Sequence, residues 1–331
     1  MIKDLFYTLK RLMAKSYSET FFKQERLLCD LCSFAMPIEG LEAFTFAPCP
    51  KCRNKVFVPL PLGDLLLFLP IGAGGFSSVY KAYHRTMGKT ILAVKIIRQE
   101  KKNDPEVIKA FLAEGTVHKQ IPAHPNIVQY IDSGHEDDEY FYAIEYVEGE
   151  RLKRRLTQKG KIPEAETLAI VAQVIGALKH IYHNGFLYRD LNAGNIIMRA
   201  DGVAKLIDFG LTMPIEQAQK ENQEDSVWGT SEYIPPERVC HGGEDACSVI
   251  YSLGMLMFHM LSGGPYINAE SAVGVAKRHV GLVRLAVSSA LLPGISEPTI
   301  KVVNTMMRQE PAERYQTFEE AEKTIALLPL K

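Results

Sequence analysis

Three side chains near the middle of this 331-residue chain have the types and the spacing that phosphoryl transfer requires. Asp190 follows Arg189, Asn195 comes five residues after Asp190, and Asp208 opens an Asp-Phe-Gly sequence soon afterwards. In that chemistry one carboxylate orients and deprotonates a hydroxyl, while an amide oxygen and a second carboxylate hold magnesium on the phosphates. We therefore expect the residues upstream to hold ATP and those downstream to present a substrate.

The glycine-rich segment 72–79 has the composition of a loop that covers phosphates. It follows an apolar run, Leu65 to Ile71, and continues into a β-rich segment at 79–83. A dinucleotide-binding loop would open a helix instead. The context therefore predicts a strand–turn–strand whose exposed backbone amides cover phosphates.

A single lysine, Lys95, lies in the middle of an apolar strand predicted at 91–97. An unpaired ammonium there is costly, so we expect a partner; a lysine that extends from an edge strand into water is the alternative. We predict that the partner is Glu114, on a helix that Asp104 caps and that begins at Pro105. This ion pair would leave the ammonium beside the α- and β-phosphates.

Four of the six cysteines form two Cys-x-x-Cys pairs, Cys29 with Cys32 and Cys49 with Cys52. This spacing predicts a closed, tetrahedral site for structural zinc. Disulfides and a redox role are disfavoured because neither a secretory signal nor a βαβ pattern is evident. The fragment resembles a zinc ribbon, a family that binds nucleic acid or protein, and its few basic residues favour a protein contact or a purely structural role.

Apolar residues recur at helical spacing between residues 2 and 15, with basic residues mostly on the other face. We predict an amphipathic helix within residues 1–26 that docks on this protein or on a protein partner; a position on a membrane surface is the alternative. Residues 59–64 contain two prolines and a glycine. They are predicted to link a cysteine module at 27–58 to a second domain at 65–331.

The composition is that of a globular protein, with 47% hydrophobic residues, 23% charged residues and a formal net charge of −1. This balance gives no general attraction to nucleic acid or to acidic membranes. No apolar run is long enough for a membrane span and the N-terminus lacks a signal-peptide profile, so we expect a cytoplasmic protein. The longest apolar block, from Val249 to Leu261, is expected to be a buried helix.

Together these segments resemble a protein kinase. The resemblance rests on Gly72-x-Gly74 to Val79, Ala93-Val94-Lys95, Glu114, His124 to Val128, Arg189-Asp190 to Asn195, and Asp208-Phe209-Gly210. It covers about four-fifths of the chain, from about Leu65 almost to the C-terminus. It implies a bilobal α+β fold, with a small antiparallel β lobe carrying one helix and a larger, mainly helical lobe.

The resemblance also implies roles for single residues. Asp190 would be the catalytic base, Asn195 and Asp208 would hold Mg2+, and Arg189 would be free to bind a phosphate on the activation loop. The residues implied to contact ATP are Ile71, Gly72, Gly74, Val79, Ala93, Lys95, Glu145, Val147, Asn195, Ile197 and Asp208. The candidate phosphorylation sites are Thr212, Ser226, Thr230 and Ser231.

Segment 229–237 resembles the end of a serine/threonine kinase activation segment. Thr230 would then face the catalytic aspartate, and Glu237 would pair with Arg314. A basic cluster between Arg151 and Lys161 has two interpretations, a solvated helix face or a surface that prefers acidic substrates.

Three positions depart from the family pattern. Tyr188 replaces a histidine, Asn192 replaces a lysine that touches the transferring phosphate, and Val249 replaces an aspartate that braces the catalytic loop. Asn192 can still donate a neutral hydrogen bond, which is weaker than a charged one. Another group must take over from the aspartate, or the loop is less rigid.

We predict a serine/threonine protein kinase that uses ATP and Mg2+, carries structural zinc and autophosphorylates. The alternative is a pseudokinase, an ATP-binding scaffold that recruits partners through the zinc ribbon. A nucleic-acid adaptor is a third hypothesis, which the near-neutral charge disfavours.

Overall fold

The computed structural model describes residues 24–328, apart from 25, 30, 88–89, 221–228, 268–270 and 282–285. The chain divides into two compact units, Met1–Phe111 with Tyr130–Tyr146 and Leu112–Gln129 with Val147–Lys331. The helix predicted within residues 1–26 lies almost entirely outside the described residues. Among the helices that are described, none combines the length and the apolar character needed to cross a membrane.

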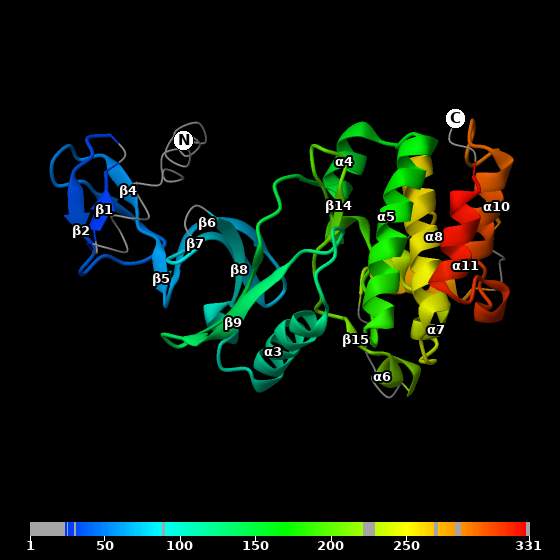
Figure 1. Cartoon of the computed structure of the whole chain (residues 1–331), viewed down its shortest axis with the longest axis horizontal. Helices are drawn as coiled ribbons and strands as arrows, with labels where there is room; N and C mark the ends of the chain where they lie inside the picture. The colour runs from blue at the N-terminus through cyan, green and yellow to red at the C-terminus, as the bar shows by residue number, and fades with distance from the viewer. Residues whose placement is uncertain are drawn as a thin grey trace. The chain divides into compact units, whose positions relative to one another are not determined.

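A six-stranded antiparallel sheet with the order β5-β6-β7-β8-β10-β9 forms the centre of the first unit (Figure 1). Its strands are β5 (Leu60–Leu62), β6 (Leu65–Ala73), β7 (Ser77–His84), β8 (Ile91–Ile97), β9 (Tyr130–Glu136) and β10 (Glu139–Glu145). β6 and β7 pair antiparallel on either side of the glycine-rich turn, which confirms the predicted strand–turn–strand. Asp137 and Asp138 have φ values of 48° and 63° and make the tight turn between β9 and β10.

The first four residues of β6 are all buried because both faces of this strand are covered. Leu65 and Leu67 join one hydrophobic cluster, with residues of β8 and β10. Leu66 and Phe68 point to the opposite face and join a second cluster. The continuous apolar run in the sequence therefore reflects two separate cores.

The second cluster belongs jointly to the sheet and to the cysteine module. The module contains two hairpins, formed by β1 (Arg26–Leu28) with β2 (Ala35–Pro37) and by β3 (Phe46–Pro48) with β4 (Lys55–Phe57). The buried side chains of the cluster include Leu27, Cys49 and Val56 from the module and Phe68 and Tyr83 from the sheet. Segment 59–64, interpreted above as a linker, contains β5, which pairs with β6, so module and sheet form a single compact unit.

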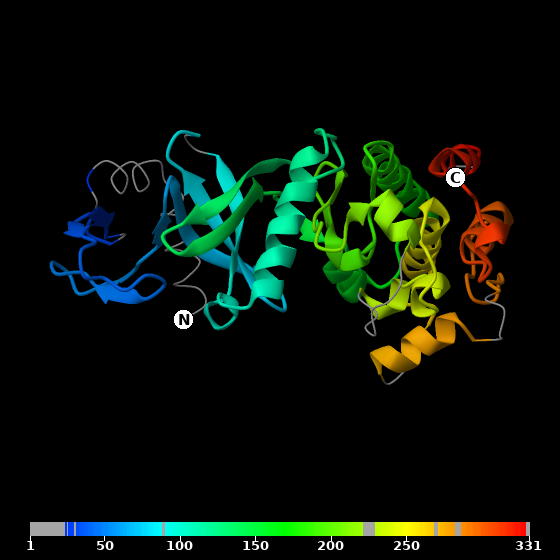
Figure 2. The ribbon, with the colours of Figure 1, turned by 90° about the horizontal axis from the view of Figure 1, so that it is seen from below.

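The second unit is mainly helical and carries two small sheets. Its helices are the end of α3 (Pro105–Gln120), α4 (Leu152–Lys159), α5 (Glu164–His183), α6 (Ile215–Lys220), α7 (Pro236–Val239), α8 (Ala246–Ser262), α9 (Ala272–His279), α10 (Glu297–Met306) and α11 (Phe318–Ala326). The short strands are β11 (Glu150–Arg151), β12 (Phe186–Leu187), β13 (Ile196–Met198), β14 (Ala204–Leu206) and β15 (Met213–Pro214). Figure 2 shows this helical unit from a second direction. α3 begins at Pro105, where the Asp104 carboxylate accepts from the Glu106 backbone N–H, as predicted.

α8 is the buried helix that the apolar block predicts. Almost all of its side chains are buried, and it contacts α5, α10 and α11. Asp245 and Ser248 form a capping box at its start, and Gly263 ends it with φ of 87°. The cap at the start of α8 also fixes the positions of the polar residues that precede this helix.

Candidate active site

The loop between β12 and β13 holds Asp190 through hydrogen bonds within the loop itself. Nδ2 of Asn195 donates to the Asp190 carboxylate at 2.9 Å and to the Asp190 backbone carbonyl at 3.0 Å. Nδ2 of Asn192 also donates to that carbonyl, at 3.1 Å, and Oδ1 of Asn192 accepts from the Gly194 backbone N–H. Because both amides are used in this way, the loop backbone around Asp190 is fixed.

Thr230 lies directly against the Asp190 carboxylate. Its backbone N–H and its hydroxyl each donate to Oδ1 of Asp190 at 3.1 Å. The carboxylate therefore accepts a hydrogen bond from a hydroxyl in the structure, which is the geometry that a general base requires.

Asp208 follows β14 on a strained stretch of backbone. Its φ is 112°, a value that residues other than glycine rarely adopt. Its Oδ1 accepts from the Gly210 backbone N–H at 3.2 Å. Burial, followed by the charges of Asp208, Asp190 and Glu114, raises the pKa of Tyr188 well above its usual range. Three carboxylates thus converge around one buried ring.

Two aromatic contacts support the Asp208 turn. The ring of His118, on α3, stacks on Phe209 with 4.0 Å between centroids and 11° between planes. Tyr188 meets Phe209 edge-on at 5.6 Å. As expected, an aromatic ring packs at position 188 in place of histidine. The Tyr188 hydroxyl is buried and has no hydrogen-bond partner among the described residues.

The donor set fits a magnesium ion. Asn195 uses its Nδ2 for Asp190, which leaves the amide oxygen for a metal, and Asp208 supplies a carboxylate. Hard oxygen donors of this kind are what Mg2+ prefers.

The other nucleotide-contact residues are divided between the two units. Ile71, Gly72 and Gly74 lie at the end of β6 and in the following turn, where the Gly74 N–H donates to the Ser77 carbonyl at 2.8 Å. Val79, Ala93 and Lys95 lie side by side on β7 and β8, and Lys95 Nζ lies 5.9 Å from the centroid of the Tyr142 ring. Glu145 ends β10. These residues belong to the first unit, while Val147, Asn195, Ile197, Asp208 and Glu114 belong to the second, so the Lys95–Glu114 ion pair stays a prediction.

The Arg189 guanidinium was expected to be free for a phosphate, but in the structure it is bound to a carboxylate. It donates through Nε and Nη2 to Oε1 of Glu244, at 2.9 and 2.5 Å. Arg238 donates to both oxygens of the same carboxylate, at 2.9 and 2.6 Å. Burial alone would raise the pKa of Glu244, but Arg238 and Arg189 outweigh it and hold that pKa below its usual range.

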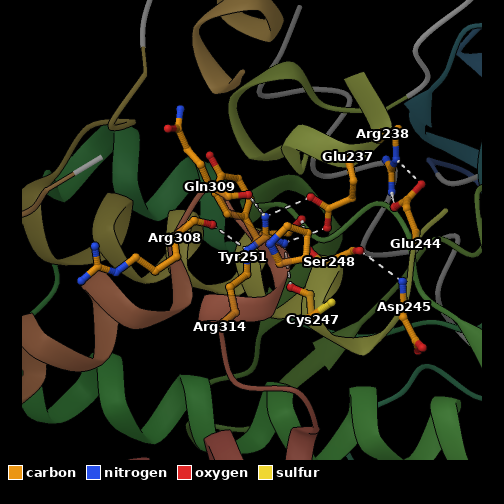
Figure 3. Close-up of polar contacts among 12 residues, drawn as sticks. Glu237, Arg238, Glu244, Asp245, Cys247, Ser248, Tyr251, Arg308, Gln309 and Arg314 are labelled. Carbon is orange, nitrogen blue, oxygen red and sulfur yellow. Dashed lines mark hydrogen bonds and ion pairs between the residues drawn. The ribbon is translucent and has the colours of Figure 1, made fainter. Parts of the chain in front are cut away.

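The predicted ion pair between Glu237 and Arg314 is present and bidentate (Figure 3). The two guanidinium nitrogens donate to the two carboxylate oxygens at 2.7 and 2.9 Å. Arg314 also donates to the backbone carbonyls of Arg308, Gln309 and Cys247. The pair therefore joins the start of α7 to the start of α8 and to the turn after α10.

Sequence reasoning missed Glu244 and Arg238. Two acidic residues, Glu244 and Asp245, stand five and four positions before Val249, which lacks the carboxylate expected there. Together these two features are the signal in the sequence that could have directed attention to this acidic pair.

The four predicted zinc ligands converge in the first unit. The Sγ atoms of Cys29, Cys32, Cys49 and Cys52 all lie within 4.8 Å of one another. The Cys29–Cys52 and Cys32–Cys49 distances are 3.5 and 3.6 Å. A zinc ion with Zn–S bonds of about 2.3 Å needs sulfur atoms about 3.8 Å apart, so the cluster fits this ion.

Burial and backbone hydrogen bonds shift the pKa values of two thiols in this cluster. Burial raises the pKa of Cys49, but backbone N–H groups of Cys52 and Lys51 outweigh it and lower that pKa to about 7. The Asn54 N–H lowers the pKa of Cys52, but burial and the three neighbouring sulfurs raise it to about 12.

The antiparallel sheet of the first unit and the mainly helical second unit are the two parts of a protein kinase fold. A family model described as "Protein kinase domain" matches residues 68–324, and the chain belongs to this family. That membership agrees with the fold class predicted from the sequence.

Among its relatives are bacterial serine/threonine-protein kinases. The chain is 32% identical over 255 residues to PrkC of Bacillus subtilis, covering 77% of this chain and 39% of that protein. It is 32% identical over 250 residues to a probable serine/threonine-protein kinase of Clostridium perfringens, covering 76% and 36%. It is 30% identical over 264 residues to PknB of Mycobacterium tuberculosis, covering 78% and 41%. The matched region thus spans less than half of each of these relatives.

Proposed function

We propose that this chain transfers the γ-phosphoryl group of ATP to serine or threonine hydroxyls of protein substrates. The observation that carries the proposal is the contact of Thr230 with Asp190, in which the carboxylate accepts a hydrogen bond from a hydroxyl at 3.1 Å. A substrate hydroxyl placed in the same way would be oriented for attack and would lose its proton to Asp190.

The surrounding residues have supporting roles. Asn195 and Asp208 would hold magnesium, which when bound neutralises charge on the phosphates. The glycine-rich turn would cover the phosphates with backbone N–H groups, and Lys95 would orient them with Glu114 as its partner. The names of the relatives support this assignment, because each is a kinase of the serine/threonine class.

The environment of Asn192 supports a second candidate function, that of a pseudokinase scaffold. Asn192 is buried, and both ends of its amide are bound to the loop backbone. It therefore offers no charge to a transferring phosphate, and one of its two N–H donors is already used on the Asp190 carbonyl. This favours slow phosphoryl transfer, or ATP binding without transfer.

We further propose that the four cysteines hold structural zinc. The support is the convergence of the sulfurs and the core that the module shares with β6 and β7. Binding at a closed site of this kind contributes directly to the folding free energy.

The test of function uses the purified full chain with labelled ATP, Mg2+ and a generic serine/threonine substrate, beside Asp190→Asn and Lys95→Met. Wild type should label the substrate and itself, and both variants should not. Equal labelling by wild type and Asp190→Asn would overturn the kinase assignment. Thermal stabilisation of the wild type by ATP, without any label transfer, would establish the scaffold.

A further inference from the structure

Glu244 is a buried carboxylate that lies between two guanidinium groups. Its exposed fraction is 1%, and the side chains of Arg189 and Arg238 are 9% and 6% exposed. Figure 3 shows the contact with Arg238. A buried ion of this kind is retained only when its partners satisfy it, and here Arg238 contacts both of its oxygens while Arg189 contacts Oε1.

The backbone around Glu244 is held on several sides. The Glu244 N–H donates to the carbonyl of Ala218 in α6. The next residue, Asp245, caps α8 and accepts from the Tyr182 hydroxyl at 2.6 Å and from Gln219 Nε2 at 2.8 Å. The carboxylate therefore reaches Arg189 from a rigid support.

Arg189 is the residue directly before Asp190, so a group that fixes its guanidinium also fixes the loop at the candidate base. The position from which an aspartate was expected to brace this loop is occupied by Val249, which is buried and has no polar group. Glu244 supplies a carboxylate five residues earlier and contacts the Arg189 side chain. It is therefore placed to brace the loop in the absence of that aspartate.

A phosphate on the activation segment would have to compete with this carboxylate. Arg189 is already bound to a negative charge that is desolvated, and a second anion beside Glu244 would be repelled. Thr230 already uses its hydroxyl on Asp190, and Thr212 is 8% exposed. Ser226 lies outside the described residues.

We propose that Glu244 is a positioning residue for Asp190, acting through Arg189, and that it makes phosphoryl transfer independent of phosphorylation of the activation segment. This inference rests on the kinase function proposed above. The Glu244 side chain is almost completely buried, and its effect is on the geometry of the loop.

The first experiment compares two forms of the full wild-type chain, one dephosphorylated by a phosphatase that is then removed and one incubated with Mg2+ and ATP. Mass spectrometry establishes the phosphorylation state of each. We expect the two forms to have the same kcat within a factor of about two. A form that is active only when phosphorylated would overturn the proposal while leaving the kinase function intact, whereas absence of transfer by both forms would overturn the kinase function itself.

The second experiment measures kcat and the KM for ATP of Glu244→Gln, with Glu166→Gln as the matched control. Glu166 also pairs with an arginine in the second unit, Arg155, and lies on α5. We expect Glu244→Gln to lower kcat about tenfold to a hundredfold with an unchanged KM for ATP, because a displaced base slows the chemical step. Glu244→Asp, which keeps the charge, should restore part of kcat.

A purely structural role would lower the unfolding temperature of Glu244→Gln but leave kcat at the wild-type value, and this result would overturn the proposal. If the buried charge left on Arg238 prevents folding, the double variant Glu244→Gln/Arg238→Gln removes one charge of each sign. It should fold and still show the lowered kcat; wild-type kcat in this double variant would equally overturn the proposal.

Discussion

The ring of Phe44 stacks on the ring of Tyr80, with 4.5 Å between centroids and 8° between planes. Phe44 belongs to the cysteine module, where its backbone N–H donates to the Val58 carbonyl at 2.7 Å. Tyr80 lies on β7, the strand that follows the glycine-rich turn. A change in the module therefore alters the packing of β7, the strand that begins at the candidate phosphate-binding loop.

Loss of zinc should weaken the sheet as well as the module. We expect Cys49→Ser to remove the bound zinc and to destabilise the first unit by at least about 2 kcal/mol, because metal binding at such sites is folding free energy. The measurement combines metal analysis with amide hydrogen exchange, which should accelerate in β6 and β7.

The control for this experiment is Cys240→Ser, which makes the same chemical change at an exposed cysteine outside the cluster. It should leave zinc content and exchange unchanged. Full zinc content in Cys49→Ser, or normal exchange in β6 and β7 after zinc is lost, would contradict the prediction.

His279 should make stability fall in mild acid. It is fully buried; its Nε2 donates to the Ser231 carbonyl, and its Nδ1 lies 2.7 Å from the Tyr251 hydroxyl oxygen. Burial lowers its pKa to about 4, against hydrogen bonding to Ser231 and the charge of Glu232, which raise it.

The sign of this effect follows from proton uptake. Between pH 6.5 and about 4 the unfolded chain binds a proton at this histidine and the folded chain does not, so acid favours unfolding by up to about 3 kcal/mol. Urea unfolding at several pH values should give a shallower pH dependence for His279→Gln than for wild type. Identical slopes for the two proteins would show that His279 does not titrate in this way.

Arg314 should tolerate no replacement, including lysine. Its side chain is fully buried and donates to Glu237 and to three backbone carbonyls, a set that one ammonium cannot satisfy. We expect Arg314→Lys to lower the free energy of unfolding by about 3 kcal/mol.

The matched control is Arg199→Lys, because Arg199 pairs with Asp201 at 3.0 Å on the exposed surface. Its free energy of unfolding should stay within about 0.5 kcal/mol of wild type. Equal losses in the two variants would mean that the buried network around Arg314 adds nothing to an ordinary surface pair.

A charge reversal at Lys153 tests whether the basic cluster selects acidic substrates or is only a solvated helix face. Other members are already paired, Arg154 with Glu150 and Arg155 with Glu166. Lys153 is exposed, and its Cδ lies 3.9 Å from the position that a Cβ on Gly194 would take, beside the catalytic loop. Its ammonium is therefore a candidate contact for a substrate residue near the accepting hydroxyl.

We expect Lys153→Glu to raise the KM about fivefold for peptides with an acidic residue before the accepting serine or threonine, which corresponds to an exposed ion pair of about 1 kcal/mol. Peptides with a basic residue there should improve. Lys159→Glu, the same charge reversal at the far end of α4, should leave the ranking of peptides as in wild type. An unchanged ranking in Lys153→Glu would favour the solvated face.

Local sequence determined much of this protein. The strand–turn–strand around Gly72 and Gly74, the start of α3 at Pro105 and the buried α8 follow from turn residues, caps and apolar periodicity, which act over a few residues. The family motifs likewise located Asp190, Asn195 and Asp208, because their spacing in the chain is part of the chemistry.

Only the tertiary structure decided which distant groups meet. Arg189 and Glu244 are 55 residues apart, and neither periodicity nor capping specifies that one will bind the other. In the same way, the apolar run of β6 does not indicate that the cysteine module covers one of its faces. Burial of charge and shared cores depend on the packing of the whole chain, so a missing carboxylate at Val249 was visible in the sequence while its replacement by Glu244 was not.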